Sequence, residues 1–209
     1  MRLDTIEPDH ADRAEIESFI RATFFDVYQA RVNTFMPHLV RLRTIHNHLV
    51  AVVGYRDAAE HRLYLEKYLD KPVEDVLSAR LGQPVRREDI VEVGNLADAA
   101  PGGARAAIII LTAFLYSAGY RWVVFTGVPK LRNAFGRLGL EPIELAPADP
   151  MHLTPQEREE WGGYYAGQPL VMGGDIRQGF ESLDMLRRLL LETWQDAMNQ
   201  GQSLAKLPA

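Results

Sequence analysis

The sequence has no cysteine among its 209 residues. This absence excludes disulfide bonds, cysteine-ligated zinc, iron–sulfur clusters and a cysteine nucleophile. A long apolar segment is also missing: the longest run, Ala106 to Leu115, is interrupted by Thr112 and is far shorter than the ~20 residues of a membrane-spanning helix. Residues 1–15 are charged and contain no apolar stretch, so we expect no secretory signal and a cytoplasmic protein.

Basic runs and catalytic serine motifs are scarce as well. The chain has 23 Lys and Arg against 28 Asp and Glu, a net charge of −5, which argues against a nucleic-acid binder. No serine lies in a G-x-S-x-G pattern, so a nucleophile-elbow hydrolase is not expected. His46 and His48 form an H-x-H pair, but no further ligand pattern accompanies them, so we expect no metal.

Hydrophobic periodicity and turn residues predict one α/β domain over 1–179, followed by a C-terminal helix and a frayed tail over 180–209. The first helix has a broad apolar face that includes Phe24, Phe25 and Tyr28, so we expect it to pack against a sheet. The predicted elements, in chain order, are a helix over 12–31, a β-hairpin over 39–56, a helix over 72–80, a strand over 89–97, a helix over 104–118, a strand over 121–126, a short helix over 131–138, a strand over 140–145, a short helix over 155–161, a strand over 170–172 and a helix over 182–199.

A glycine-bearing loop precedes the most apolar of these helices. Gly102 and Gly103 allow the backbone to approach a ligand closely, and the first-turn amides of a helix attract anions. Arg105 adds a positive charge in the first turn. The spacing therefore indicates an anion site, with a simple chain turn as the alternative; no P-loop or dinucleotide fingerprint is present.

Three segments resemble the core of the GNAT superfamily of acyltransferases. They are Val91 to Ala97, Trp122 to Thr126, and Leu131 to Leu140 (LRNAFGRLGL), which is similar to the N-x-x-A-x-x-F/Y-x-x-x-G-F element. The stretch Glu92 to Ala97 is also similar to a strand of acyl-homoserine lactone synthases.

Over about Ala14 to Gly179 the chain resembles the thermostable hemolysin family. The resemblance includes Tyr68-Leu69-Asp70 and Trp161-Gly162. Further matching segments are Phe35-Met36-Pro37, Leu65-Glu66, Ile90 to Ala97, Trp122 to Gly127, Leu138-Gly139-Leu140, Ala148-Asp149-Pro150 and Tyr164-Tyr165.

The resemblance implies a GNAT-like mixed, splayed β-sheet flanked by helices, with a C-terminal helical extension. An acyl donor would lie between the strands at 90–97 and 121–126, as an acyl-CoA or acyl-carrier-protein thioester. The loop departs from the usual Q/R-x-x-G-x-G/A phosphate pattern, which weakens the case for coenzyme A. The donor-binding residues that the resemblance implies are Leu96, Ala97, Gly102, Gly103, Ala104, Arg105, Asn133 and Phe135.

Glu92 and Asn95 are the candidate catalytic residues. Glu92 is the carboxylate of an otherwise apolar strand, where burial would raise its pKa and suit it to act as a base. Its alternative role is structural, in an ion pair with Arg56 or Arg105. Asn95 would face opposite to Glu92 in a regular strand, and a bulge at Gly94 would relax that constraint.

Many GNAT enzymes protonate the leaving thiolate with a tyrosine at the position where this chain has Phe135. Phe135 cannot donate a proton, so water or a tyrosine such as Tyr164 or Tyr165 would replace it. The candidate substrate-contacting residues are Arg21, Phe25, Tyr28, Arg56, Trp161 and Tyr164, the last two in a segment that could form a lid. Plain packing is the alternative for all of them.

The sequence thus predicts an N-acyltransferase that moves an acyl group to a small amine, in a secondary-metabolite or signalling pathway. The expected partners are that amine, an acyl carrier protein and a second copy of the chain, without nucleic acid and without a membrane span. The alternatives are a membrane-active lytic protein, as the family name implies, and a GNAT fold that binds an acyl ligand without turnover. The sequence shows no long amphipathic insertion segment that lysis would favour.

Overall fold

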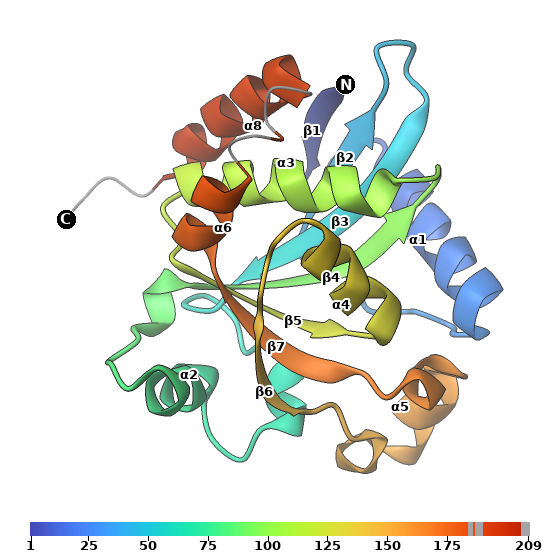
Figure 1. Ribbon diagram of the computed structural model, residues 1–209. Helices are drawn as coiled ribbons and strands as arrows, with labels where there is room; N and C mark the ends of the chain where they lie inside the picture. Colours follow the sequence, from blue (N-terminus) through green and yellow to red (C-terminus); the bar gives the residue numbers. More distant parts are fainter. Residues whose placement is uncertain (184–185, 187–189, 206–209) are drawn as a thin grey trace.

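A seven-stranded mixed sheet forms the centre of the molecule in the computed structural model (Figure 1), which describes residues 1–183, 186 and 190–205. The strand order is β1-β2-β3-β4-β5-β7-β6. The strands are β1 (Arg2–Ile6), β2 (His38–Arg43), β3 (Leu49–Asp57), β4 (Ile90–Asp98), β5 (Trp122–Gly127), β6 (Ile143–Pro147) and β7 (Leu170–Asp175).

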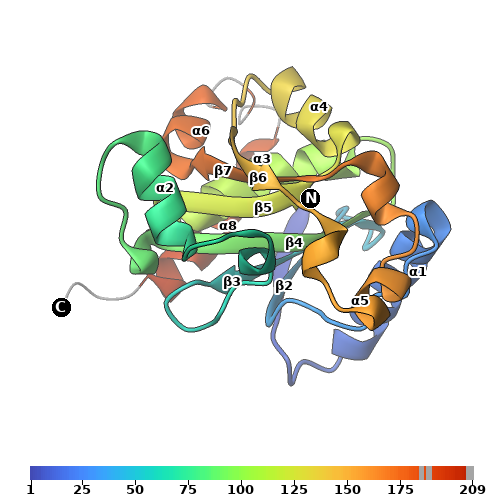
Figure 2. The same cartoon turned by 90° about the horizontal axis from the view of Figure 1, so that it is seen from below.

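Helices cover both faces of this sheet (Figures 1 and 2). One face carries α3 (Gly103–Ser117), α4 (Pro129–Arg137), α6 (Ile176–Ser182) and α8 (Leu191–Leu204). The other face carries α1 (Arg13–Tyr28), α2 (Val73–Leu81) and α5 (Pro155–Glu160). Short 3-10 helices lie at Leu65–Tyr68, Arg87–Asp89, Pro150–His152 and Tyr164–Gly167.

Each central strand supplies apolar side chains to both layers. In β3, Val53 belongs to the core under α3, whereas Val52 belongs to the core under α1. This two-sided burial explains why β3 begins as a continuous apolar run rather than an alternating one. Helix α3 lies between the sheet and α8, and Gly201 of α8 rests directly against the carbonyl of Phe114.

The sheet opens between its two parallel strands. β4 pairs with β5 from Ile90 opposite Trp122 to Val93 opposite Phe125, and the ladder stops there. Beyond this point β4 remains paired with β3 as far as Asp98. The register of β3 and β4 shifts between Val52 and Gly54, which gives β4 an extra residue and bends it away from β5.

Asn95 occupies this bulge in a left-handed conformation, with φ of 51°. A bulge at Gly94 was considered from the sequence as one way to reorient Asn95, and the splay between the two strands was predicted from the GNAT resemblance. The GNAT-like fold class, with its mixed sheet, flanking helices and C-terminal helix, is therefore confirmed.

The structure corrects several details of the predicted secondary structure. β1 was not predicted; it forms the sheet edge beside β2. The apolar face of α1 is narrower than predicted, because Phe25 and Val27 are exposed. The helix predicted over 182–199 corresponds in its C-terminal part to α8, which continues through Leu204, past the start of the predicted frayed tail. The rest of that prediction, at 184–185 and 187–189, lies outside the described residues.

The end of α1 is joined tightly to the segment after α5. The amide of Gly163 donates to the carbonyl of Tyr28 at 2.7 Å, and the amide of Arg31 donates to the carbonyl of Glu160 at 2.6 Å. Gly162 sits at this junction with φ of 49°, and a Cβ there would lie 2.6 Å from the carbonyl oxygen of Gln29. The contact therefore requires glycine.

We predict that Gly162→Ala lowers the free energy of unfolding by about 2 kcal/mol or more, because the new Cβ is both strained and in collision with backbone. Urea denaturation measures the change. Gly136→Ala is the matched control: Gly136 lies in α4 with open space around it, so alanine should stabilise by ~1 kcal/mol. Equal stability of Gly162→Ala and the wild type would contradict the close contact.

Candidate active site

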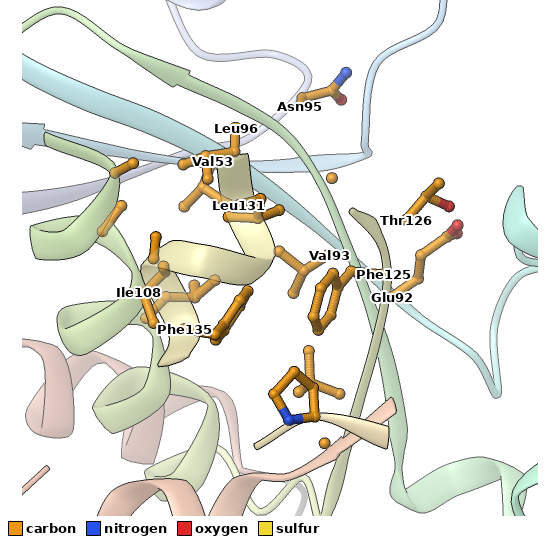
Figure 3. Close-up of a pocket in the computed structure, with 18 of the residues that line it drawn as sticks. Val53, Glu92, Val93, Asn95, Leu96, Ile108, Phe125, Thr126, Leu131 and Phe135 are labelled. Atoms are coloured by element: carbon orange, nitrogen blue, oxygen red, sulfur yellow. The ribbon is translucent and has the colours of Figure 1, made fainter. Parts of the chain in front are cut away.

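A cavity of about 400 Å³ passes through the sheet where β4 and β5 separate. Residues on both faces of the sheet line this cavity, because no hydrogen bonds join the two strands where they diverge. Figure 3 shows Val93, Phe125 and Phe135 clustered on the α4 side of the sheet, with Glu92 and Thr126 turned to the other side. We describe the two halves as the apolar lobe and the aromatic lobe.

The apolar lobe lies under α3 and α4. One face of α3 lines it through Ala104, Ala107, Ile108, Leu111, Thr112 and Leu115, and β4, β5 and α4 add Val93, Phe125, Leu131, Ala134 and Phe135. Phe125 and Phe135 stack with ring centroids 4.8 Å apart. Gly179 of α6 closes the far end, where an added Cβ would lie 3.6 Å from the methyl group of Thr112.

The aromatic lobe lies on the opposite face. It consists of Phe24, Tyr28, Tyr64, Tyr68, Trp161, Tyr164 and Tyr165. The Trp161 indole donates a hydrogen bond to the Tyr64 hydroxyl at 2.8 Å, and the Tyr164 hydroxyl donates to the Thr126 carbonyl at 3.4 Å. The hydroxyls of Tyr68 and Tyr165 bond to each other. Burial raises the pKa of Tyr164, so this hydroxyl keeps its proton.

Glu92 forms part of the wall of this lobe and is 3% exposed. Its two carboxylate oxygens accept backbone N–H bonds from Tyr64 and Leu65, both at 2.9 Å. The guanidinium of Arg56 lies 3.8 Å from the same carboxylate. Burial raises the pKa of Glu92, and the two amides and Arg56 oppose that rise. The ion pair with Arg56 named as the structural alternative is present; Arg105 is exposed and is not among the residues that line this cavity.

Asn95 lines the cavity at the bulge, but its carboxamide oxygen accepts the backbone N–H of Met36 at 2.7 Å. In Figure 3 its side chain points away from Ile108 and Phe135. This hydrogen bond fixes the segment before β2 against the bulge, so Asn95 helps to shape the opening of the sheet.

The N-terminus of α3 lies at the end of β4, as predicted. Gly102 has φ of 83°, and the first intrahelical bond runs from the amide of Ala106 to the carbonyl of Gly102 at 3.0 Å. The amides of Ala104 and Arg105 precede this bond. Asp98 lies beside them, since a Cβ added at Gly103 would be 3.1 Å from the Asp98 Cβ. A carboxylate at this position opposes a second anion.

The cavity brings together most of the predicted site residues but not all. Those that line it are Tyr28, Arg56, Glu92, Asn95, Leu96, Ala104, Phe135, Trp161 and Tyr164. Those outside its lining are Arg21, Phe25, Ala97, Gly102, Gly103, Arg105 and Asn133. Ala97 is fully buried against the α1 layer because of its place after the bulge. Arg21 and Phe25 face a separate shallow groove on the outer side of α1.

Sequence reasoning missed Tyr64 as a site residue and left the segment around it ambiguous. The signal was a pair of tyrosines, Tyr64 and Tyr68, spaced four residues apart ahead of a proline-started helix. Only the fold shows that the carboxylate of Glu92 holds this segment by its backbone amides.

The family model for thermostable hemolysin matches residues 6–180. The chain belongs to the thermostable hemolysin family. No curated protein matches the sequence. Among the described residues, no helix has both the length and the apolar character that a membrane crossing needs, and no cluster of three or more His, Asp or Glu could hold a metal ion.

Solved structures similar to this hemolysin-family chain share its fold. The acyl-homoserine lactone synthase LasI is 11% identical, with 83% of this chain and 89% of that chain covered and a TM-score of 0.54. BjaI, a CoA-dependent acyl-homoserine lactone synthase solved with SAM and isopentyl-CoA, is 12% identical, with 97% and 99% covered and a TM-score of 0.56. FeeM, an N-acyl amino acid synthase from uncultured soil microbes, is 12% identical, with 84% and 93% covered and a TM-score of 0.53.

Two polar clusters support the aromatic lobe from outside. Arg87 donates to Glu66 and Glu74 and to the carbonyl of Ala58, which fixes the loop before Tyr64. On the other side, Thr154 and Glu157 form a capping box at the start of α5. Lys67 pairs with Glu157 and so joins the tyrosine loop to the helix that precedes Trp161.

This junction predicts an acid-sensitive contribution to stability. The bond from Lys67, together with the amide of Thr154, lowers the pKa of Glu157 from 4.5 to about 2. A depressed folded-state pKa stabilises the protein above the unfolded pKa, and this stabilisation is lost as the pH falls through the folded pKa. The stability difference between wild type and Glu157→Gln, from urea unfolding, should therefore be constant above pH 4.5 and disappear near pH 2.

Glu159→Gln is the control, because Glu159 is an exposed carboxylate of the same helix. Its stability difference from wild type should change much less over this range. A Glu157→Gln difference that does not depend on pH would show that the Lys67 contact adds nothing in solution.

Proposed function

We propose that the protein is an N-acyltransferase that moves an acyl group from a thioester to a small amine. The observation that carries this proposal is the cavity through the splayed sheet, with an apolar lobe on one face and a buried carboxylate on the other. A donor and an acceptor could reach the same gap from opposite sides. Such a meeting point is what a transfer reaction needs.

The apolar lobe suits the acyl chain of the donor. Its lining residues on α3 run from Ala104 to Leu115, about 16 Å at 1.5 Å per residue, which favours a medium or long chain. Beyond Val93, the edge of β4 that faces β5 has no strand partner among the residues that the structure describes. Its backbone groups, near Leu96, could bind the amides of a pantetheine arm and polarise the thioester carbonyl.

The donor is proposed to be acyl-CoA or an acyl carrier protein, which both carry pantetheine, and the reaction is proposed to take place in the cytoplasm. The α3 amides could bind phosphates, but the carboxylate of Asp98, whose Cβ lies close to Gly103, opposes a second anion there. A poor phosphate site favours an acyl carrier protein over coenzyme A as the donor. Transfer rates with dodecanoyl-CoA, dodecanoyl carrier protein and dodecanoyl-pantetheine would separate the contributions of nucleotide, protein and arm.

Glu92 is the proposed base. The amine nitrogen forms the new C–N bond as the C–S bond breaks, and the proton that nitrogen loses balances the proton that the thiolate gains. Each oxygen of Glu92 accepts one amide bond and retains a second lone pair, so a water in the cavity can carry the proton to it. Phe135 cannot protonate the thiolate, and Tyr164, protonated and facing the gap beside Thr126, is the proposed acid.

We predict that Glu92→Gln lowers kcat by ~10²–10⁴, because transfer loses its base. In the wild type, kcat should fall as the pH drops through a pKa that burial raises above 4.5. Release of free thiol from the donor measures both, and the cysteine-free chain contributes no thiol of its own. The variant also turns an NH₂ group toward a backbone amide, so we expect a loss of ~1–3 kcal/mol in stability.

Leu63→Ala controls for this loss, because it destabilises the same loop by ~2–5 kcal/mol and leaves the carboxylate in place. It should retain its rate at temperatures where it is folded. Full kcat in Glu92→Gln would make the carboxylate purely structural. Leakage of lipid vesicles by the protein alone, without thiol release from any donor, would replace the transferase with a lytic protein.

A second prediction concerns chain length. Thr112 lies about 12 Å along α3 from Ala104, in the distal part of the lobe beside Gly179. Thr112→Phe should lower kcat/KM for long-chain donors about tenfold and spare short-chain donors, because its ring fills the volume that the chain end would occupy. Thr112→Val, which keeps the volume, is the control. A uniform loss at all chain lengths would contradict an acyl chain in this lobe.

A further inference from the structure

The aromatic lobe contains two opposite charges side by side at its base. Arg56 of β3 stands opposite Glu92 of β4 in the strand register, and the guanidinium Nη1 lies 3.8 Å from the carboxylate Oε2. Both side chains are largely buried, with 15% and 4% exposed, and both line the cavity. A buried pair of this kind is costly to retain for stability alone.

The guanidinium of Arg56 has donors left over. It has five N–H groups, and Nη1 donates to the carbonyl of Arg62 at 3.2 Å. Within the part of the chain that the structure describes, Nε and Nη2 have no hydrogen-bond partner. Because the side chain lines the cavity, these donors can meet a ligand there. A guanidinium with free adjacent donors matches a carboxylate, which it can bind through two parallel bonds.

The carboxylate of Glu92 complements this donor. It sits beside Arg56 and favours a cationic or hydrogen-bond-donating nitrogen. An acceptor that fits both groups carries an amine and a carboxylate on the same carbon atom. The separation of 3.8 Å between the two protein groups suits an amine and a carboxylate joined through one carbon.

The remaining walls of the lobe determine what the rest of the acceptor can be. Trp161 lies 6.1 Å from Phe24 and 5.0 Å from Tyr164 between ring centroids, and Tyr28 lies 5.1 Å from Tyr164. These rings offer apolar faces and edges that favour an aromatic or bulky aliphatic group. A charged group would lose its hydration there and would find, besides Arg56 and Glu92, only the tyrosine hydroxyls of the wall, most of which already bond to one another or to neighbouring groups.

We propose that the acceptor is a free α-amino acid with an aromatic or bulky apolar side chain. This inference rests on the proposed transferase function and specifies its substrate class. Arg56 binds the carboxylate of the amino acid, and Glu92 takes the proton of its amino group. The amino nitrogen forms the amide bond as the C–S bond of the donor breaks, and the thiol leaves with the proton.

The test compares each amino acid with the amine that lacks only its carboxylate. With dodecanoyl-CoA or dodecanoyl carrier protein as donor, the pairs are phenylalanine with 2-phenylethylamine and leucine with 3-methylbutylamine. Thiol release gives the rate, and mass spectrometry identifies the amide. Wild-type kcat/KM should be at least ~100-fold higher for the amino acid of each pair, because the amine leaves the Nε and Nη2 donors of Arg56 without an acceptor.

Arg56→Gln should bring this ratio close to one, since the discrimination depends on the guanidinium. Arg62→Gln is the matched control: it removes an exposed arginine of the same loop while the carbonyl that Arg56 contacts stays in place, so the ratio should not change. Glycine, serine and aspartate should be poor acceptors compared with phenylalanine, because they leave the aromatic walls uncovered.

Two results would overturn the inference and leave the proposed function intact. One is equal use of amines and amino acids by the wild type. The other is an Arg56→Gln variant that loses both activities in the same proportion, which is the behaviour of a structural residue. Absence of thiol release from every donor with every acceptor overturns the proposed function, and the inference with it.

Discussion

The end of pairing between β4 and β5 is the constraint on which the rest of this structure depends. Beyond Val93 and Phe125 the two parallel strands no longer share hydrogen bonds. The bulge at Asn95 bends β4 toward β3, and the bond from the Met36 amide to the Asn95 carboxamide secures that bend. A sheet normally separates the two helix layers of an α/β protein completely. Here one cavity reaches both layers.

Glu92 links the fold and the proposed chemistry. Its oxygens accept hydrogen bonds from the amides of Tyr64 and Leu65, so the loop that supplies Tyr64 and Tyr68 to the aromatic lobe takes its position from this carboxylate. The same burial that makes these bonds strong raises the pKa of Glu92. Its structural and chemical roles therefore do not exclude each other, because each oxygen can accept more than one hydrogen bond.

Periodicity and turn residues predicted most of the helices and strands, because these signals depend on neighbours along the chain. The splayed strand pair was implied by the resemblance of the β4 and α4 segments to the GNAT core. The burial of Glu92 and the direction of its pKa shift were also predictable, because Glu92 is the carboxylate of an otherwise apolar strand. The orientation of α1 on the sheet was not predictable from this pattern. Phe25 belongs to the same apolar pattern as Phe24, but its side chain is exposed. Tyr64 was not predicted as a site residue, because its place there depends on a contact between residues far apart in the sequence. The Arg56–Glu92 pair was one of two alternatives named from the sequence, and the strand register brings its two residues together.

The two lobes of the cavity also determine the physical character of what would leave it. In the proposed reaction, an acyl tail from one face and a charged acceptor from the other would be joined at the gap into a single-chain amphiphile with a polar head. Molecules of this shape partition into bilayers in proportion to the length of the tail. Membrane damage of the kind that the family name describes would then come from a small surfactant made by the protein, and would require no part of the chain itself to enter a lipid bilayer.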